Sequence, residues 1–224
     1  NINFQTISKS PLFKGVPVNV IQQEFEQLHY RVLHYAKNDT IVQRGNQLEE
    51  IRIVLSGHVR SEIDTGDHIT KVADLHAPMV LAPGFLFGKE NVYPVNVIAN
   101  VDTEILCMPK SEFMKLMQMN KDIMSNYLDI ISSRAQFLAK RIQLLSLRTI
   151  KQKIAKYLLD LAEDKLQNFE LPMTQTKLAE YFAVARPPLT KAFADLNKDG
   201  IIDIKARTVY ILNKQALQQI VTSK

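Results

Sequence analysis

The sequence predicts an α+β fold built from three consecutive parts: a β-barrel or jelly roll, one long helix, and a small helical domain that carries a hairpin. Three observations lead to this prediction. Short strand-like runs alternate with turn residues over 30–108, an unbroken helical pattern covers 120–146, and two short helical patterns precede two strand-like runs within 173–211. We therefore expect three domains or segments: 1–119, 120–148 and 149–224.

The first part begins with a short apolar-faced helix over residues 18–29 and continues as strands. Several strand-like runs alternate apolar and polar residues with period two: 30–35, 51–55, 58–63 and 95–101. Five of the seven glycines lie in this region and mark its turns: Gly45, Gly57, Gly66, Gly84 and Gly88. Many short strands at this spacing are typical of a barrel or a double-sheet jelly roll.

The long helix carries two apolar stripes. The first is a heptad seam with alternating steps of four and three residues: Met124, Leu128, Ile131, Ala135, Leu138, Ile142 and Leu145. The second runs beside it: Ile123, Tyr127, Ile130, Phe137 and Leu144. Because one stripe is enough to cover one surface, we expect one to pack on the barrel and the other on the same helix of a second subunit. The alternative is a helix buried inside a single domain.

The C-terminal part reads as two short helices, a hairpin and short links. One face of the first helix is apolar at Leu178, Ala179 and Phe182, and one face of the second at Leu189, Ala192, Phe193 and Leu196. The link of Ala183 and Val184 is so short that the helices must cross steeply. Gly200 ends the second helix, and a hairpin with its turn at 205–207 follows. This order predicts a winged helix-turn-helix, whose second helix fits the major groove of DNA. The alternative is a small α+β domain that shows the pattern by chance.

Composition limits the class of protein. No apolar run reaches the roughly 18 residues that a membrane span needs, and the first residues do not resemble a secretory signal. Cys107 is the single cysteine, which excludes an internal disulfide and a four-cysteine Fe–S or zinc site. Residues 149–224 hold 12 Lys and Arg against 8 Asp and Glu, a basic balance that suits DNA. We expect a cytoplasmic protein that binds double-stranded DNA and has neither a membrane partner nor an enzymatic activity.

Contacts with DNA are expected at the exposed ends of the two short helices. Thr174 can cap the first helix, and together with Gln175 and Lys177 it can donate to a phosphate. A cap and nothing more is the alternative for Thr174. Thr190 and Lys191 lie on the exposed face of the second helix, where Lys191 meets either a base or, as we favour, a phosphate.

Several sequence pieces, in this order along the chain, carry a family resemblance: Val42-Gln43-Arg44-Gly45, Leu55-Ser56-Gly57-His58-Val59, Leu178-Ala179-Glu180-Tyr181-Phe182, Val184-Ala185-Arg186 and Asn197-Lys198-Asp199-Gly200-Ile201-Ile202. Over nearly its full length the chain resembles the CRP/FNR family of bacterial transcription regulators. The resemblance implies a cupin-like barrel of the cyclic-nucleotide-binding-domain type that senses an effector. It also implies a homodimer that binds an inverted repeat in promoter DNA and contacts RNA polymerase.

The resemblance assigns a base-reading role to the start of the second short helix. Arg186 stands where family members carry an arginine that can pair with guanine O6 and N7. Pro187 stands where many members carry a glutamate, so we expect a different half-site and an apolar contact with a thymine methyl instead. Lys205 and Arg207 at the hairpin turn are expected on phosphates, and a solvated turn is the alternative.

The same comparison argues against a cyclic nucleotide as effector. Family members that bind one carry Gly-Glu, Arg-Ser and Thr-Ser pairs, where this chain has Lys89 in place of the glutamate, Pro94-Val95 and Leu138-Ala139. A cyclic phosphate buried without its arginine would be an unpaired charge, so we expect no cyclic AMP binding. The expected pocket either takes an apolar or anionic ligand or is filled by its own side chains: Phe85, Phe87, Lys89, Tyr93, Val95 and Arg134.

The other sensing chemistries of the family also find no ligands in this sequence. His58, His68 and His76 are spread along the chain without the paired spacing of a cupin metal site, and Cys107 reads as a buried apolar residue. We therefore expect no haem, no Fe–S cluster and no metal. Two alternatives to a regulator are a cupin-type metalloenzyme with a helical appendage and a signalling module that binds protein partners. The effector, the target site and the direction of regulation do not follow from the sequence.

Overall fold

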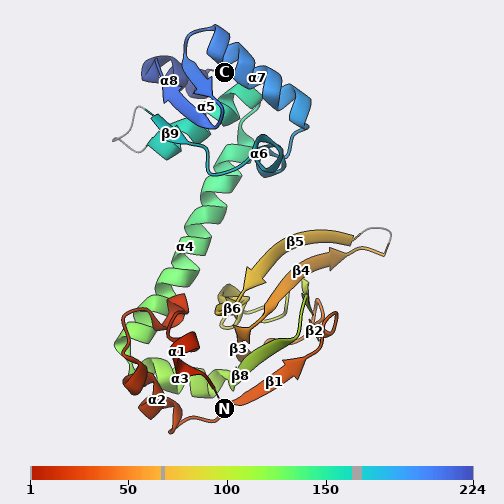
Figure 1. Ribbon diagram of the computed structural model, residues 1–224, viewed down its shortest axis with the longest axis vertical. Helices are drawn as coiled ribbons and strands as arrows, with labels where there is room; N and C mark the ends of the chain where they lie inside the picture. Colours follow the sequence, from red (N-terminus) through yellow and green to blue (C-terminus); the bar gives the residue numbers. More distant parts are fainter. Residues whose placement is uncertain (1, 67–68, 163–167, 224) are drawn as a thin grey trace. The chain divides into compact units, whose positions relative to one another are not determined.

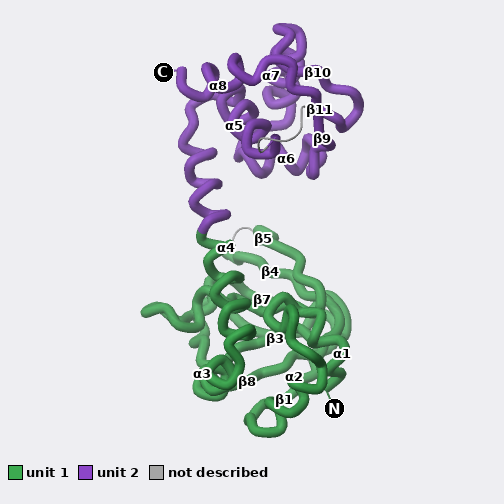
Figure 2. The backbone as a smooth tube through the Cα atoms, turned by 90° about the vertical axis from the view of Figure 1, so that its left-hand side faces the viewer, with its two compact units in different colours: residues 1–135 green, residues 136–224 purple. Residues whose placement is uncertain are grey.

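The computed structural model describes residues 2–66, 69–162 and 168–223. It contains two units, Asn1–Ala135 and Gln136–Lys224, each with its own hydrophobic core (Figure 2). The border between the units lies within the long helix α4 (Lys121–Ser146) (Figure 1). That helix therefore supplies side chains to both cores.

Unit 1 is built on two four-stranded antiparallel sheets (Figure 1). One has the order β1-β8-β3-β6 and consists of β1 (Arg31–Tyr35), β8 (Thr103–Pro109), β3 (Glu50–Ser56) and β6 (Met79–Leu81). The other has the order β2-β7-β4-β5 and consists of β2 (Thr40–Val42), β7 (Asn96–Ala99), β4 (His58–Asp64) and β5 (Ile69–His76). The predicted jelly-roll type of fold is confirmed, but the sheets do not close into a barrel, because no ladder between these strands joins the two sheets.

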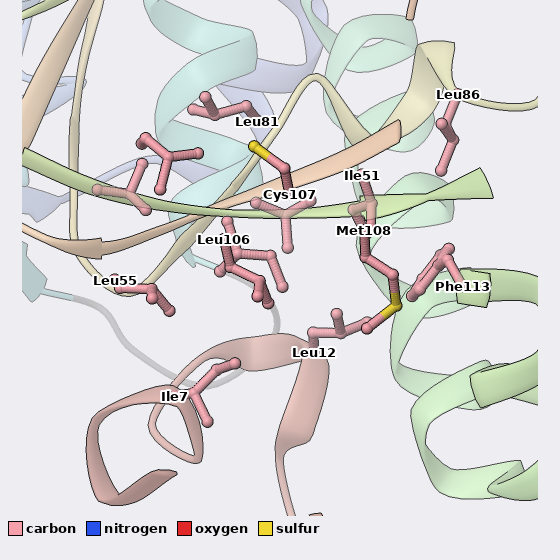
Figure 3. Close-up of a cluster of buried hydrophobic side chains, with 14 of the residues drawn as sticks. Ile7, Leu12, Ile51, Leu55, Leu81, Leu86, Leu106, Cys107, Met108 and Phe113 are labelled. Carbon is pink, nitrogen blue, oxygen red and sulfur yellow. The ribbon is translucent and has the colours of Figure 1, made fainter. Parts of the chain in front are cut away.

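Strand β8 is covered on both faces, which explains its continuous apolar run. Leu106 and Met108 point toward Leu12, whereas Cys107 between them points to the opposite face, beside Leu81 (Figure 3). The N-terminal segments and the helix after β8 belong to the same unit: α1 (Phe4–Ile7), the 3-10 turn η1 (Pro11–Phe13), α2 (Val18–Phe25) and α3 (Lys110–Met119). The helix predicted over 18–29 ends earlier, at Phe25.

One of the two apolar stripes of α4 packs on the units of its own chain. Ile123 and Tyr127 are buried in the core of unit 1, and the Tyr127 hydroxyl donates to the Pro83 carbonyl at 2.6 Å. The expectation that the whole stripe lies on the sheet domain is wrong at its C-terminal end. Leu144 is buried in the core of unit 2, and the Phe137 ring lies 6.4 Å from the Tyr181 ring of the same unit. The reason is that the last turns of α4 belong to unit 2.

The heptad seam of α4 is mostly uncovered. Ile131 is half-buried and packs against the core of unit 1, and Ala135 is exposed. The large side chains of the seam are between 38% and 68% exposed: Met124, Leu128, Leu138, Ile142 and Leu145. These exposures contradict the alternative of a helix buried inside a single domain.

Unit 2 contains the predicted winged helix-turn-helix. Its elements after α4 are α5 (Ile150–Ala162), β9 (Asn168–Glu170), α6 (Gln175–Phe182), α7 (Arg186–Lys198), β10 (Ile202–Lys205), β11 (Thr208–Ile211) and α8 (Lys214–Thr222). The sheet was predicted as a two-stranded hairpin, but β9 adds a third strand in the order β10-β11-β9. The sequence interpretation also missed α8, which packs on α5 and buries Leu217 in the core.

Candidate nucleic-acid interface

The two short helices of unit 2 bury the faces predicted for them. Their apolar residues are at most 7% exposed and lie in one core with α5 and the sheet: Leu178, Ala179, Phe182, Leu189, Ala192, Phe193 and Leu196. Because these faces are used for packing, the opposite faces of α6 and α7 are the ones that remain for another molecule.

The link between α6 and α7 is a tight turn fixed by backbone hydrogen bonds. Ala183 has a left-handed φ of 54°, and its N–H donates to the Glu180 carbonyl at 3.1 Å. The Val184 N–H donates to the Ala179 carbonyl at 3.0 Å. This pair of bonds is a Schellman motif, which ends α6 and leaves three residues, 183–185, between α6 and α7.

The start of α6 is capped as predicted. The Thr174 hydroxyl accepts a hydrogen bond from the Lys177 backbone N–H at 3.3 Å, which confirms the capping role. Gln175 is the first residue of α6, and its amide oxygen accepts from the Thr190 hydroxyl of α7 at 2.9 Å. The Lys177 and Lys191 side chains belong to exposed residues on the same two helices. Hydroxyl, amide and ammonium donors are thus present at the helix start, and these groups bind phosphates in protein–DNA complexes.

The first turn of α7 presents an arginine and two proline rings. Arg186, Pro187 and Pro188 are exposed, and Ala185 precedes them without a side-chain cap. A helix N-terminus normally presents free backbone N–H groups, but Pro187 and Pro188 have none. The following N–H group, that of Leu189, already donates to the Ala185 carbonyl at 3.4 Å. The hydrogen-bonding capacity of this turn therefore lies mainly in the Arg186 guanidinium.

The wing turn is shorter than predicted. Lys205 pairs with Thr208 across the hairpin, so the turn consists of Ala206 and Arg207 and not of three residues. The Arg207 guanidinium donates to the Leu171 carbonyl at 2.8 Å. This bond ties the wing to the segment before α6.

Both cations of the wing tip have partners within the chain. The Lys205 ammonium lies 3.3 Å from the Asp203 carboxylate and 5.5 Å from the centre of the Tyr210 ring. The Arg207 guanidinium lies 3.5 Å from the Glu170 carboxylate. Their side chains are still 73% and 52% exposed, so both remain accessible to a phosphate.

The residues predicted for an effector pocket fall into two groups. Tyr93 is buried, and Val95 is half-buried. The others lie on the surface: Phe85, Phe87, Lys89 and Arg134. Burial raises the pKa of Tyr93 to about 12, and the Arg52 guanidinium lies 5.9 Å from the centre of its ring. The Tyr93 hydroxyl has no hydrogen-bond partner in the described part of the chain.

Phe87 and Tyr93 have different surroundings. The Phe87 ring packs at 5.8 Å from that of Tyr127 on α4, and the Lys110 ammonium lies 4.8 Å from the centre of the Phe87 ring. The buried Tyr93 side chain therefore belongs to the core, whereas Phe87 is an exposed aromatic residue that packs beside the first turns of α4.

The histidines are not all separated, as the sequence interpretation assumed. His58 and His76 face each other across β4 and β5, with ring centres 5.0 Å apart and nearly parallel planes. The cause is the antiparallel register, which pairs the first residue of β4 with the last of β5. His68 lies outside the described residues. Among residues 2–66, 69–162 and 168–223, no three His, Cys, Asp or Glu side chains are grouped so that they could hold a metal ion.

Comparison with known proteins gives the same two parts. Residues 152–220 match the family model described as a Crp-like helix-turn-helix domain, and residues 32–120 match that of the cyclic nucleotide-binding domain. The chain belongs to the CRP/FNR family. As predicted, it is a DNA-binding transcription regulator of the CRP/FNR type, with an N-terminal sensor domain of the cyclic-nucleotide-binding class.

The relatives of this CRP/FNR regulator are distant. It is 23% identical to the cyclic AMP receptor protein of Thermus thermophilus over 220 residues, which cover 94% of this chain and 96% of that protein. It is 22% identical to the transcriptional activator FnrA of Stutzerimonas stutzeri over 187 residues, 81% of this chain and 76% of that protein. The crystal structure of the Thermus thermophilus catabolite activator protein matches with a TM-score of 0.55 at 20% identity, over 94% of this chain and 98% of the other.

None of the described helices is long and apolar enough to span a membrane.

Proposed function

We propose that this CRP/FNR regulator acts as a homodimer that binds an inverted repeat in promoter DNA. The observation that carries the proposal is the exposed heptad seam of α4, which continues in the same chain as a winged helix-turn-helix. Large apolar side chains on a heptad spacing gain stability when a second helix covers them. A two-fold dimer then presents two recognition helices to two half-sites.

The proposed functional segments are a sensor domain over 1–119, a dimerisation helix and hinge over 120–148, and a DNA-binding domain over 149–224. Two further roles come from the family. The dimer contacts RNA polymerase at the promoter, and it works in the cytoplasm, where the bacterial chromosome lies.

Within each half-site, α7 reads the major groove and α6 holds the phosphate backbone. Arg186 donates to guanine O6 and N7, a contact worth about 1–3 kcal/mol of discrimination. Pro187 packs on a thymine methyl, since a proline side chain can neither donate nor accept. Thr174, Gln175, Lys177 and Lys191 contact phosphates, and Thr190 supports them. Lys205 and Arg207 of the wing add phosphate contacts beside their partners within the chain.

We propose that the N-terminal domain senses an effector other than cyclic AMP. Supporting this, Pro94 and Val95 stand where cyclic-nucleotide binders carry an Arg-Ser pair, and neither side chain can donate a hydrogen bond to a phosphate. An apolar or anionic ligand near Phe85, Phe87, Lys89 and Arg134 is one form of the proposal; a pocket filled by its own side chains is the other. No cofactor and no enzymatic reaction are part of this function.

The test is selection of bound duplexes from a random DNA pool by the purified 224-residue chain, at near-physiological salt and without added effector. A two-fold symmetric site with a guanine facing Arg186 is the expected result. Arg186→Ala should lose site-specific binding and keep the fold. If the effector-free dimer enriches no motif, the proposal that it binds DNA without an effector is contradicted. If the Arg186→Ala variant binds the selected site as tightly as the parent protein, the proposed role of Arg186 is contradicted.

A further inference from the structure

The hinge between α4 and α5 is closed by the side chain of one buried glutamine. Gln152 is 6% exposed. Its amide oxygen accepts from the backbone N–H groups of Arg148 and Thr149, at 3.1 and 3.0 Å. The Thr149 hydroxyl in turn accepts from the Gln152 N–H at 3.1 Å. This is a capping box that also includes the hinge residue before the cap.

The same side chain also reaches the last turn of the chain. The Gln152 amide nitrogen donates to the Ser223 carbonyl at 2.7 Å, just after α8. This buried amide accepts two hydrogen bonds and donates one, all with backbone groups of two segments: the one before α5 and the one after α8. A buried amide satisfied in this way holds its partners in one arrangement, because every alternative leaves a polar group unpaired.

The hinge packs against the core of unit 2 through Leu147 and Ile150, but one side of it is open. A cavity of about 350 Å³ opens beside it and is lined by Ser146, Leu147, Arg148, Gln152, Val221 and Ser223. Beside this space, the hydrogen bonds of Gln152 constrain the backbone of Arg148 and Thr149. They join the end of α4 to the start of α5.

A second contact joins α4 to the helix-turn-helix within unit 2. The Arg141 guanidinium lies 5.5 Å from the centre of the Tyr181 ring of α6, and the Phe137 ring lies 6.4 Å from it. Leu144 is buried in the same core. This contact and Gln152 together define one orientation of the last turns of α4 relative to α6 and α7.

We propose that Gln152 is a positioning residue that sets the half-site spacing of the DNA target. The inference rests on the proposed dimer, in which the paired α4 helices fix the frame from which each helix-turn-helix is held. Two recognition helices fit half-sites one helical turn apart only if each leaves α4 at a defined angle. The hydrogen bonds of the Gln152 side-chain amide oxygen to Arg148 and Thr149 define that angle. Without these bonds the hinge would adopt several angles and the dimer would accept several half-site spacings.

The experiment uses the dimer of the 224-residue chain and a duplex library in which the selected half-sites are kept and only the number of base pairs between them varies. Gln152→Leu keeps the size of the side chain and removes all of its hydrogen bonds. We expect the parent protein to bind its best half-site spacing about tenfold or more tightly than its second-best spacing. In Gln152→Leu this ratio should fall to within about threefold, while the sequence of each half-site stays unchanged. Lys156→Gln, which removes an ion pair with Asp160 on the same helix, is the matched control and should keep the spacing.

A second variant should loosen the hinge less than Gln152→Leu does. Gln152→Glu is not suitable for this purpose, because it would place a carboxylate oxygen against the Ser223 carbonyl, so the second variant is made at Thr149. Thr149→Val removes only the reciprocal bond and gives an intermediate loss of preference, which also provides a test if the leucine variant does not fold. Retention of the spacing by both Gln152→Leu and Thr149→Val overturns the inference. A parent protein that selects no symmetric site instead contradicts the proposed function itself.

Discussion

The Thr190 hydroxyl on α7 donates to the amide oxygen of Gln175 on α6, across a distance of 2.9 Å. The bond fixes the amide of Gln175 with its oxygen toward the recognition helix, so that its NH₂ group points elsewhere and is oriented before DNA arrives. We therefore expect Thr190 to act on DNA binding through Gln175, in addition to the proposed direct contact.

We predict that Thr190→Val weakens DNA binding about three- to tenfold, since a net hydrogen bond is worth roughly 0.5–1.5 kcal/mol. Titration of the selected duplex at fixed salt measures the effect. Thr190→Ser keeps the hydroxyl and should restore most of the affinity. Equal weakening by valine and serine would show that the hydroxyl has no orienting role.

The two helices of the helix-turn-helix, α6 and α7, are each followed by a residue with a left-handed backbone conformation, and only one of these residues is a glycine. Ala183 has φ 54° after α6, and Gly200 has φ 67° after α7 with open space around its α-carbon. A left-handed backbone costs a residue with a β-carbon about 1 kcal/mol. Ala183→Gly should therefore stabilise the protein by about 1 kcal/mol, and Gly200→Ala should destabilise it by about the same amount, in denaturant unfolding. Shifts of the same sign in both variants would contradict this argument.

Gly57 and Gly45 form a second matched pair, this time in unit 1. Both have φ above 80°, but a β-carbon at Gly57 would meet the Asp102 carbonyl and the Thr103 hydroxyl at 2.6 Å, whereas one at Gly45 meets nothing within 4 Å. Gly45→Ala should cost about 1 kcal/mol of unfolding free energy. Gly57→Ala should cost about 1–3 kcal/mol more because of the clash. Equal thermal midpoints for the two variants would show that the β3–β4 turn can relax.

Ile142 is the most exposed large side chain of the heptad seam, at 68%. Ile142→Glu should place a charge in the proposed dimer interface and shift the protein to monomers, with loss of binding to the symmetric site. Sedimentation at micromolar concentration measures the oligomeric state. Ser133→Glu adds the same charge at an exposed position of α4 outside the seam and should leave the dimer intact.

The Cys107 thiol should be unreactive in the folded protein. Burial raises its pKa to about 11, with the Glu50 carboxylate as the second cause, so at pH 8 almost no thiolate is present. We expect slow reaction with a disulfide reagent at pH 8, and complete reaction within minutes in denaturant, where the thiol is exposed and its pKa returns to about 8.5. Fast labelling of the native protein would place the thiol at the surface.

The sequence was informative wherever a side-chain pattern is read locally. Thr174, Ala183 and Gly200 marked the ends of α6 and α7 because capping and left-handed turns depend on only a few neighbouring residues. The buried faces of both helices followed from their spacing alone. The exposed seam of α4 also followed, because a heptad pattern does not need to be satisfied within one chain.

Non-local pairing explains most of the failures. Strand β9 has only three residues and becomes a strand only because β11 pairs with it. His58 and His76 meet only through the register of β4 and β5. The role of Gln152 was missed although the Thr149-x-x-Gln152 spacing of a capping box was visible. Its contact with Ser223, 71 residues away, was not.

Pro187, in the first turn of α7, has a consequence for the binding of chemically modified DNA. Thymine and 5-methylcytosine carry their methyl group at the same ring position, and they differ in the major groove by the oxygen or amino group at C4. A glutamate at the position of Pro187 would distinguish these groups, because it accepts a hydrogen bond from the amino group only. A pyrrolidine ring distinguishes neither. At the base facing Pro187, a promoter that exchanges thymine for methylated cytosine keeps the proposed contact, so that contact would depend on the presence of a methyl group more than on the identity of the base.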